Sequence, residues 1–495
     1  MIDHDTFQSA LGWRYGSEPM RRLWSEAHKR RLMRRVWLAL AEAEAAAGLV
    51  PEASVGALRR TVDDIDIARA AVHEATTQHD VMAEILTWAE QIGPAGGILH
   101  LGATSADITD NVDVLRLQGG LDIVRAGLAR VVSTLAARTE ETADTVCLGW
   151  THLQPAAPTT VGYRLAFALQ DFVDDLAAVD DARAGLRTKG FKGAVGTSAS
   201  YAALLEGHAA TPADLERDAC ARLGLTPALV TSQVYSRKGD WRVLNALAGL
   251  AATAAQLAFD IRILQSPPFG EWSEGFAAGQ VGSSAMPWKR NPINAENVDS
   301  LARQLAVLPQ VAWHNAANCL LERTLDDSAN RRLLLPDAFL LADEIVARTL
   351  RLIERLAVDA ASVSANLARF GPFVAGERVL IAAAGLGADR QVLHERIRQH
   401  SVEAWAVVAA GGANPLPALL AGDEAITAWL TPDAVRALVA DPAAHVGDAA
   451  ARARQCAALA RQAAERPAAT VRSARLAAET TEATATILRA DAPAR

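Results

Sequence analysis

Residues 282–292 of this 495-residue chain read GSSAMPWKRNP and lie in a segment rich in glycine and proline. Two adjacent hydroxyl groups, Ser283 and Ser284, come shortly before the cation Lys289 and the amide Asn291. A mobile backbone that holds a hydroxyl beside a fixed positive charge suits the removal of a proton from a carbon next to a carboxylate. The simpler interpretation is an ordinary glycine- and serine-rich surface loop that precedes a helix.

Long helical segments flank this loop on both sides. Apolar residues recur with helical period over residues 111–142, 160–186, 238–265, 292–319 and 327–358. A helix over the third of these ranges extends about 40 Å, and one of its faces carries Leu244, Leu247, Ala251, Ala254, Leu257, Ile261 and Leu264. Long helices in one block predict an all-α chain built on an elongated bundle. The apolar surface of such a bundle is extensive enough to favour association between copies.

Two smaller helical units are expected on either side of the bundle. Glycine–proline pairs interrupt the helical pattern before and after it, at residues 93–94 and 371–372. We therefore predict an N-terminal helical domain, a central long-helix bundle and a C-terminal helical domain over residues 1–104, 105–358 and 359–495. The glycine-rich loop of the bundle is assigned to residues 266–291, and its glycines are expected to make it flexible.

The chain carries a formal net charge of −8 at pH 7, with 51% hydrophobic and 21% charged residues. This balance indicates a globular protein without a general affinity for nucleic acid or acidic membranes. The cysteines are scattered without metal-ligand spacing, and no dinucleotide fingerprint follows a strand, so we expect neither a metal nor an organic cofactor. The N-terminus lacks a secretory signal, and the longest uncharged run is too short to span a membrane. We therefore expect a cytoplasmic location.

Two histidines lie in segments that suit a functional role. His152 belongs to THLQPAAPTTVGYR over residues 151–164, and His79 opens HDVMA over residues 79–83. The adjacent Asp80 can orient the imidazole of His79 and raise its basicity. The alternative for His152 is a buried core histidine. The alternative for Asp80 is a cap at a helix N-terminus, which is compatible with the functional role.

A cluster of hydroxyls is expected at a helix entrance. Thr104, Ser105 and Asp107 lie close together in HLGATSADITDN over residues 100–111. Hydroxyl groups and free N–H groups at a helix N-terminus form a natural cradle for a carboxylate. The competing interpretation is a plain capping box, which needs no ligand.

The segment ERTLDDSANRR, residues 322–332, bears on the class of substrate. Ser328 and Arg332 lie four residues apart, so a helix places them on one face, and Arg323 comes just before the helix starts. Two arginines and a hydroxyl that converge on a helix N-terminus indicate a phosphate site. The alternative is that the arginines only neutralise the two aspartates of the same segment.

Taken in order, these segments and the pair Arg14-Tyr15 near the N-terminus resemble the adenylosuccinate lyase family of the fumarase/aspartase superfamily. The resemblance covers nearly the whole chain, from about residue 14 to about residue 430. It implies a three-domain all-α fold whose long helices assemble into a tetrameric core, with each active site formed where three subunits meet. It also implies a β-elimination that releases fumarate from adenylosuccinate, giving AMP, and from the succinyl-aminoimidazole-carboxamide ribotide of purine biosynthesis.

The resemblance assigns roles to individual residues of this sequence. Ser283 would be the general base that removes the Cβ proton, His152 the general acid at the departing nitrogen, and His79 a supporting residue. Lys289 would stabilise the carbanion and, with Asn291, bind the succinyl carboxylates. Further substrate contacts would come from Asp80, Thr104, Ser105, Thr151, Gln233 and Ser284. The nucleotide phosphate would be held by Arg14, Tyr15, Arg323, Ser328 and Arg332.

Two other functions are compatible with parts of this pattern. A lyase of the same superfamily could act on a small non-nucleotide succinyl compound, such as argininosuccinate or nitrosuccinate, in specialised metabolism, and that substrate needs no phosphate-binding arginines. A helical scaffold that has lost catalysis would tolerate the loss of the two histidines or the signature serine, yet all three are present. The expected partners are a small-molecule nucleotide and further copies of this chain in a homotetramer with shared active sites.

Overall fold

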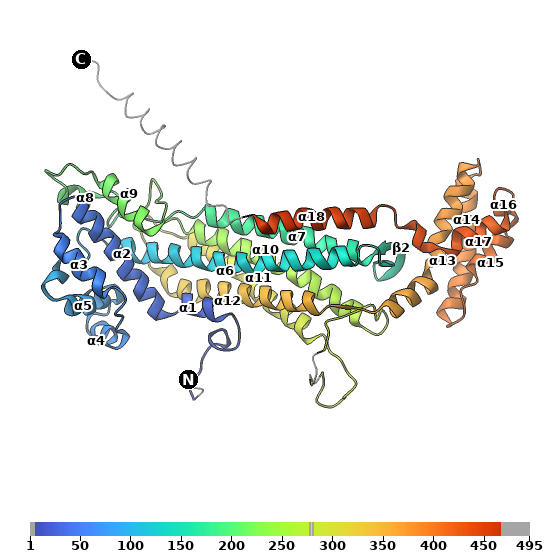
Figure 1. Ribbon diagram of the computed structural model, residues 1–495, viewed down its shortest axis with the longest axis horizontal. Coiled ribbons are helices and arrows are strands. Elements are labelled where there is room, and N and C mark those ends of the chain that lie inside the picture. The colour runs from blue at the N-terminus through green and yellow to red at the C-terminus, as the bar shows by residue number, and fades with distance from the viewer. Residues whose placement is uncertain (1–4, 277–278, 280–281, 467–495) are drawn as a thin grey trace, which may run out of the picture.

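The computed structural model describes residues 5–276, 279 and 282–466, and five long helices lie side by side in one elongated bundle (Figure 1). These helices are α6 (Ser105–Glu141), α7 (Val161–Ala184), α10 (Lys238–Gln265), α11 (Ile293–Ala317) and α12 (Asp326–Arg355). Helix α10 lies along α11, and α6 packs against both α7 and α12. The prediction of an all-α fold around a central long-helix bundle is confirmed.

Helix α10 shows how the apolar pattern sets the core. It begins and ends at the predicted residues, and each position of its predicted apolar face is at most 5% exposed. Among the residues that the structure describes, α10 is also the one helix long and apolar enough to cross a membrane by length and composition. Half of the most apolar stretch of α10 is buried inside the bundle, as expected for the core helix of a large bundle.

Side-chain caps fix where two of the bundle helices begin. The apolar pattern predicted α6 from about residue 111, but the helix begins at Ser105 because Thr104 and Asp107 form a reciprocal capping box. Helix α7 begins where it was predicted, and Thr160 Oγ1 accepts the N–H of Tyr163 at 3.1 Å. The early start of α6 places two predicted binding residues at a helix N-terminus.

Shorter helices cover one end of the bundle (Figure 1). Most of them precede α6 in the chain, whereas α8 and α9 come from the connection between α7 and α10, and α9 packs against α2. Segments far apart in the sequence therefore meet at this end. The elements are η1 (Ala10–Gly12), α1 (Glu18–Leu23), α2 (Glu26–Ala46), α3 (Glu52–Thr61), α4 (Ile67–Thr77), α5 (Asp80–Ile92), η2 (Gly93–Ile98), α8 (Ala199–Leu204) and α9 (Pro212–Leu223).

The opposite end of the bundle carries a second helical unit with a core of its own. It comprises α13 (Ala360–Gly385), α14 (Arg390–Ala409), α15 (Leu416–Gly422), α16 (Glu424–Thr427), α17 (Pro432–Ala440) and η3 (Pro442–His445). Helix α18 (Ala449–Glu465) then returns along α6 and α7 and contributes Ala457 and Ala460 to the main core. The division of the chain at residues 104 and 358 stays a prediction.

Two short antiparallel strand pairs interrupt the helices. Strand β1 (Val146–Thr151) pairs with β2 (Gln154–Thr160), and β3 (Trp272–Ser273) pairs with β4 (Ala357–Val358). His152 and Leu153 link β1 to β2, and both have positive φ, 53° and 58°, which is the pattern of a two-residue hairpin turn of type I′. The sequence pattern did not predict this hairpin because β2 contains two prolines, which argue against a strand.

Candidate active site

His79 lies at the end of the bundle that the N-terminal helices cover, and it is the N-cap residue of α5. Its Nδ1 accepts the N–H of Met82 at 3.4 Å, so the neutral ring carries its proton on Nε2. That Nε2 lies 3.4 Å from the Oγ of Ser105 at the start of α6. The side chain of His79 is 44% exposed, so the imidazole is accessible to a ligand.

Asp80 is surrounded by cations. One of its oxygens lies 3.3 Å from Nζ of Lys29 and 3.7 Å from the guanidinium of Arg332, and the other lies 3.8 Å from Nδ1 of His79. Burial alone would raise the pKa of Asp80, but the charges of Lys29 and Arg332 outweigh it and hold this pKa below its usual value. The carboxylate is therefore ionised at neutral pH, and its charge attracts the guanidinium of Arg332.

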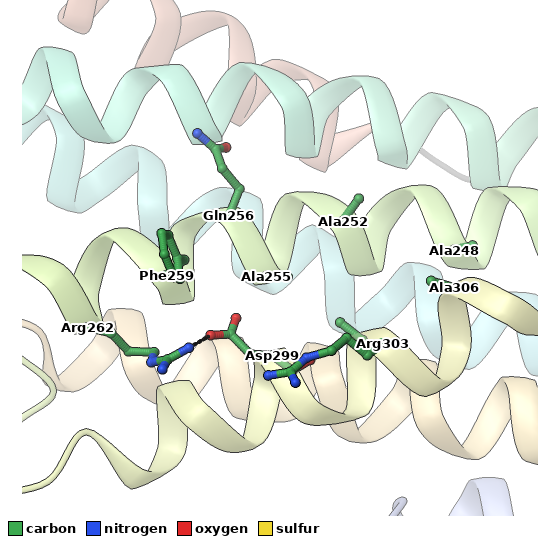
Figure 2. Close-up of a pocket in the computed structure, with 10 residues that line it drawn as sticks. Ala248, Ala252, Ala255, Gln256, Phe259, Arg262, Asp299, Arg303 and Ala306 are labelled. Carbon is green, nitrogen blue, oxygen red and sulfur yellow. Dashed lines mark hydrogen bonds and ion pairs between the residues drawn. The ribbon is translucent and has the colours of Figure 1, made fainter. Parts of the chain in front are cut away.

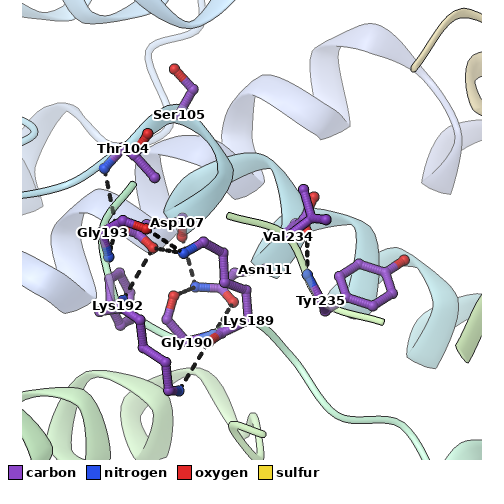
Figure 3. A network of polar contacts seen from close by, with 12 residues as sticks. Thr104, Ser105, Asp107, Asn111, Lys189, Gly190, Lys192, Gly193, Val234 and Tyr235 are labelled. Atoms are coloured by element: carbon purple, nitrogen blue, oxygen red, sulfur yellow. Dashed lines mark hydrogen bonds and ion pairs between the residues drawn. The ribbon is translucent and has the colours of Figure 1, made fainter. Parts of the chain in front are cut away.

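Figure 3 shows the buried polar network behind the start of α6. Asp107 is fully buried, accepts the N–H of Thr104 at 3.0 Å and pairs with Nζ of Lys189 at 2.7 Å. The same carboxylate accepts the N–H groups of Lys192 at 3.2 Å and Gly193 at 3.1 Å. A buried carboxylate with this many donors is fully compensated and holds its partners in one arrangement. The cap of α6 and the loop that contains both lysines therefore form one rigid unit.

The residues of segment 322–332 lie beside this unit. The N–H of Gln233 donates to the carbonyl of Glu322 at 3.0 Å, and Arg323 pairs with Asp327 at 2.8 Å. Arg332 is mostly exposed and lies one helical turn from Ser328 on α12. Because one arginine is paired within the segment and the other faces solvent, both the ion-pair and the phosphate interpretation have contacts in their favour.

Two buried arginines near this group were not predicted from the sequence. Arg237 pairs with Asp327 at 2.7 Å and with Asp110 at 3.1 Å, and Arg331 pairs with Asp240 at 2.8 Å. Arg331 lies in the segment 322–332 and is the neighbour of a predicted phosphate ligand. The available signal was charge in an otherwise apolar helix pattern, but nothing in the sequence showed that these guanidinium groups would be buried and paired.

Arg14 and Tyr15 lie against the middle of α12 and not at its start. The N–H of Gly16 donates to Glu344 at 3.0 Å, and the guanidinium of Arg348 lies 5.7 Å from the ring centroid of Tyr15. Arg348 also donates to the side chain of Asn294, at the start of α11, at 3.4 Å. Arg14 and Tyr15 therefore lie near the exit of the glycine-rich loop, and Arg348 is a cation there that the sequence did not reveal.

The described part of the glycine-rich loop holds Ser283 in a local turn. Its Oγ accepts the N–H of Met286 at 3.1 Å and that of Ala285 at 3.4 Å. Asn291, expected to contact substrate, donates to the carbonyl of Gly282 at 2.9 Å. A Cβ at Gly282 would lie 2.2 Å from the carbonyl oxygen of Lys289, so this position requires glycine. Residues 277–278 and 280–281 of the predicted loop lie outside the described residues.

His152 and Thr151 lie at the tip of the β1–β2 hairpin, at the opposite end of α6 from His79. Both residues are exposed, which excludes, within this chain, the alternative of a buried core histidine. The hairpin follows the C-terminus of α6, and α13 packs against both of its strands. Its turn directs the imidazole away from the core of its own chain.

The predicted residues thus form three separate groups in one chain. The first, around the start of α6, contains His79, Asp80, Thr104, Ser105, Gln233, Arg323, Ser328 and Arg332. The second, beside the start of α11, contains Arg14, Tyr15, Ser283, Ser284, Lys289 and Asn291. The third contains Thr151 and His152. Helix α6 has 37 residues and extends about 55 Å between the first group and the third, so one chain cannot place both around a small ligand.

Models of known protein families match two stretches of this chain. A lyase family model matches residues 16–306, and a model of the adenylosuccinate lyase C-terminus matches residues 372–455. The adenylosuccinate lyase of Saccharomyces cerevisiae is 40% identical over 86% of this chain and 89% of its own length. The chain belongs to the adenylosuccinate lyase family. The enzymes of that name from Schistosoma mansoni and Pyrococcus abyssi are 38% and 35% identical, and the matches cover 82% and 80% of this chain and 85% and 86% of theirs.

Solved structures of other enzymes have the same fold as this member of the adenylosuccinate lyase family. The 3-carboxy-cis,cis-muconate lactonizing enzyme of Pseudomonas putida superposes with a TM-score of 0.81 at 26% identity, over 92% of this chain and all of that one. A fumarate lyase from a Mesorhizobium species has a TM-score of 0.79 at 23% identity, over 92% of this chain and 99% of that one. The fold is therefore that of the fumarase/aspartase superfamily, and the enzyme is a carbon–nitrogen lyase.

Proposed function

We propose that this enzyme cleaves adenylosuccinate to AMP and fumarate, and that it releases fumarate from the succinyl-aminoimidazole-carboxamide ribotide of purine biosynthesis in the same way. The observation that carries the proposal is the 40% identity with the adenylosuccinate lyase of Saccharomyces cerevisiae over most of both chains. The chemistry is a β-elimination. It needs a base at Cβ, an acid at the departing nitrogen and stabilisation of the negative charge between them.

Ser283 is proposed as the base. A serine hydroxyl is a feeble base at neutral pH, so the alkoxide must be stabilised where it forms. The N–H groups of Ala285 and Met286 already donate to this Oγ, and they would strengthen as the oxygen becomes negative. Lys289, six residues further on in the same loop, supplies a positive charge for the alkoxide or for the succinyl carboxylates. The two backbone donors to its Oγ support Ser283 over the neighbouring Ser284.

His152 is proposed as the acid that protonates the departing nitrogen, with His79 in a supporting role. The exposed position of His152 at a hairpin tip supports this assignment, because the ring is presented to a ligand outside its own chain. General acid catalysis typically contributes about 10²–10⁴-fold to a rate. His79, already 3.4 Å from the Ser105 hydroxyl, would meet the substrate together with Thr104 and Ser105 at the N-terminus of α6.

The active unit is proposed to be a homotetramer in which several chains contribute to each site. The length of α6 supports this, because it separates His79 from His152 within a chain. A second support is the open groove between α10 and α11 (Figure 2), where small side chains of both helices leave room for another helix to approach closely. Phe259 beside this groove is 53% exposed. The groove is lined by alanines 248, 252, 255, 302 and 306 together with the Arg262–Asp299 ion pair.

The location is proposed to be cytoplasmic, which the four unpaired cysteines support.

The phosphate of the nucleotide is proposed to bind to Arg14, Tyr15, Arg323, Ser328 and Arg332. One observation favours a different substrate. Arg323 pairs with Asp327, and Arg332 approaches Asp80, so both cations have carboxylate partners without a phosphate. The alternative is a lyase for a small succinyl compound that lacks a phosphate.

The test is to mix the purified protein with adenylosuccinate and to follow fumarate release, with argininosuccinate and nitrosuccinate as comparison substrates. The proposal predicts rapid release from adenylosuccinate and none above background from the other two. Release from argininosuccinate or nitrosuccinate alone would replace it with the alternative. Release from none of the three would overturn both.

A further inference from the structure

The hairpin that carries His152 is weakly held by its own strand pairing. The register shifts between Leu148 and Trp150, so the ladder is irregular just before the tip. Pro155 faces Trp150 and Pro158 faces Leu148, and neither proline has an N–H to donate across the ladder. The position of the tip must therefore be set by contacts outside the hairpin.

Trp150, two residues before His152, makes those outside contacts. Its ring meets Phe269 at a centroid distance of 4.8 Å and Phe370 at 5.9 Å, both nearly edge-on. Its Nε1 donates to Oε1 of Glu271 at 3.3 Å. Such aromatic contacts and a partly buried hydrogen bond fix both the place and the rotation of the indole.

Glu271 is itself held from three directions. It is fully buried, and its other oxygen accepts from Arg164 of α7 at 3.2 Å. Asn366 of α13 donates to the oxygen that Trp150 uses, at 3.1 Å. Arg164 also donates to the carbonyl of Leu148 in β1 at 2.6 Å. A buried carboxylate with a cationic and two neutral donors cannot move without leaving a charge uncompensated, so it forms a fixed reference point for the hairpin.

We propose that Trp150 and Glu271 are positioning residues for the elimination, and that they act by setting where His152 meets the substrate. The proposal rests on the proposed function, since it takes His152 to be the acid. Proton transfer requires the imidazole within hydrogen-bond reach of the departing nitrogen, and a displacement of about 1 Å can cost a hundredfold in rate. The indole and the carboxylate supply the rigidity that the strand ladder lacks.

The test is a double-mutant cycle between Trp150→Phe and His152→Ala, with turnover of adenylosuccinate by the full-length protein as the readout. Trp150→Phe keeps an aromatic ring between Phe269 and Phe370 but deletes the N–H. With His152 present, it should lower kcat about tenfold and change KM less than about twofold. With His152 replaced, the same substitution should have almost no effect on kcat, because there is no imidazole left to misplace.

Trp272→Phe is the matched control. Trp272 follows Glu271 directly and is also buried, but its Nε1 has no hydrogen-bond partner among the described residues. Its ring lies 5.5 Å from the guanidinium of Arg164, and phenylalanine keeps an aromatic face there, so this substitution should leave kcat and KM nearly unchanged. Glu271→Gln is a second probe, because it keeps the shape and an acceptor while removing the charge. It should lower kcat only in protein that retains His152. This result tests the proposal even if Trp150→Phe is too unstable to assay.

The outcomes separate the claims. If Trp150→Phe lowers kcat equally in both backgrounds, or no more than Trp272→Phe does, the positioning role is overturned and the indole is merely structural. If His152→Ala alone retains near-normal turnover, the acid assignment under the proposed function fails, and the positioning role fails with it. That second failure is recognised from the single variant before the cycle is completed.

Discussion

The start of α6 and the glycine-rich loop hold their predicted site residues in contrasting ways. At the start of α6, Asp107 joins the helix cap to the loop that contains Lys189 through buried charge-assisted contacts. In the described part of the glycine-rich loop, the side chain of Ser283 accepts hydrogen bonds from residues two and three positions away, at the surface. The start of α6 is therefore arranged before any ligand binds, whereas the proposed base is held, among the described residues, by a local turn at the surface.

The largest effect is expected from the base. Ser283→Ala should reduce turnover of adenylosuccinate by several orders of magnitude and leave its binding nearly intact, because only the proton acceptor is lost. Single-turnover fumarate release and equilibrium binding measure the two quantities. Ser284→Ala is the matched control and should cost at most about tenfold. Near-normal turnover of Ser283→Ala would rule this serine out.

The second-largest effect tests the rigidity of the start of α6. Asp107→Asn removes the partner of a fully buried lysine and should destabilise the protein by about 3–5 kcal/mol. Asp122→Asn breaks an exposed pair with Arg183 and should cost at most about 1 kcal/mol. Chemical unfolding of both variants gives the comparison. Equal losses would mean that the start of α6 is no more rigid than the surface.

A third prediction concerns a buried acid behind the same unit. Burial raises the pKa of Glu44 to about 8, and its Oε1 has no hydrogen-bond partner among the described residues. Because the folded pKa lies above the unfolded one, the contribution of Glu44 to stability is greatest below about pH 4.5 and is lost as the pH rises through about 8. Glu44→Gln should therefore match the parent near pH 4.5 and exceed its stability by a few kcal/mol at pH 8.

Thermal or denaturant unfolding across that pH range measures this difference. Glu42→Gln serves as the control, because Glu42 pairs with Arg59 and Arg222 near the surface and should show no gain at pH 8. If Glu44→Gln gave the same stability difference at both pH values, the carboxyl would not be buried in its neutral form.

The smallest effect is expected for Arg332, an exposed residue of the group around the start of α6. Arg332→Gln should raise the KM for adenylosuccinate about tenfold with little change in kcat, because a charge-assisted contact to the phosphate is lost in the ground state and the transition state alike. Steady-state kinetics check this, with Arg436→Gln at the far end of the molecule as the control. An unchanged KM would favour the substrate without a phosphate.

Much of the fold could be predicted because its signal is local. Helix α10 was predicted to the residue, since its apolar face repeats without interruption and every position of it is buried. The hairpin was missed, since Pro155 and Pro158 oppose a strand locally and are tolerated only because α13 and Glu271 hold the hairpin from outside. Tertiary contacts of this kind leave no periodic pattern in the sequence.

The site could be predicted as a set of residues but not as an arrangement. The motifs identified His79, Ser283 and His152, yet nothing in them revealed that α6 would separate His79 from His152. The Asp107–Lys189 pair was missed for a related reason, because the two residues are 82 positions apart and each belongs to a segment with an adequate local interpretation.

The central claim is that His79 of one chain and His152 of another serve the same site. It is tested most directly by mixing inactive variants, His79→Ala and His152→Ala, under conditions in which subunits exchange. Each variant alone should be at least about a hundredfold impaired. Mixed in equal amounts, they should recover about a quarter of the normal activity, because random assembly gives that share of sites both intact histidines. A mixture no more active than its two components would contradict the claim.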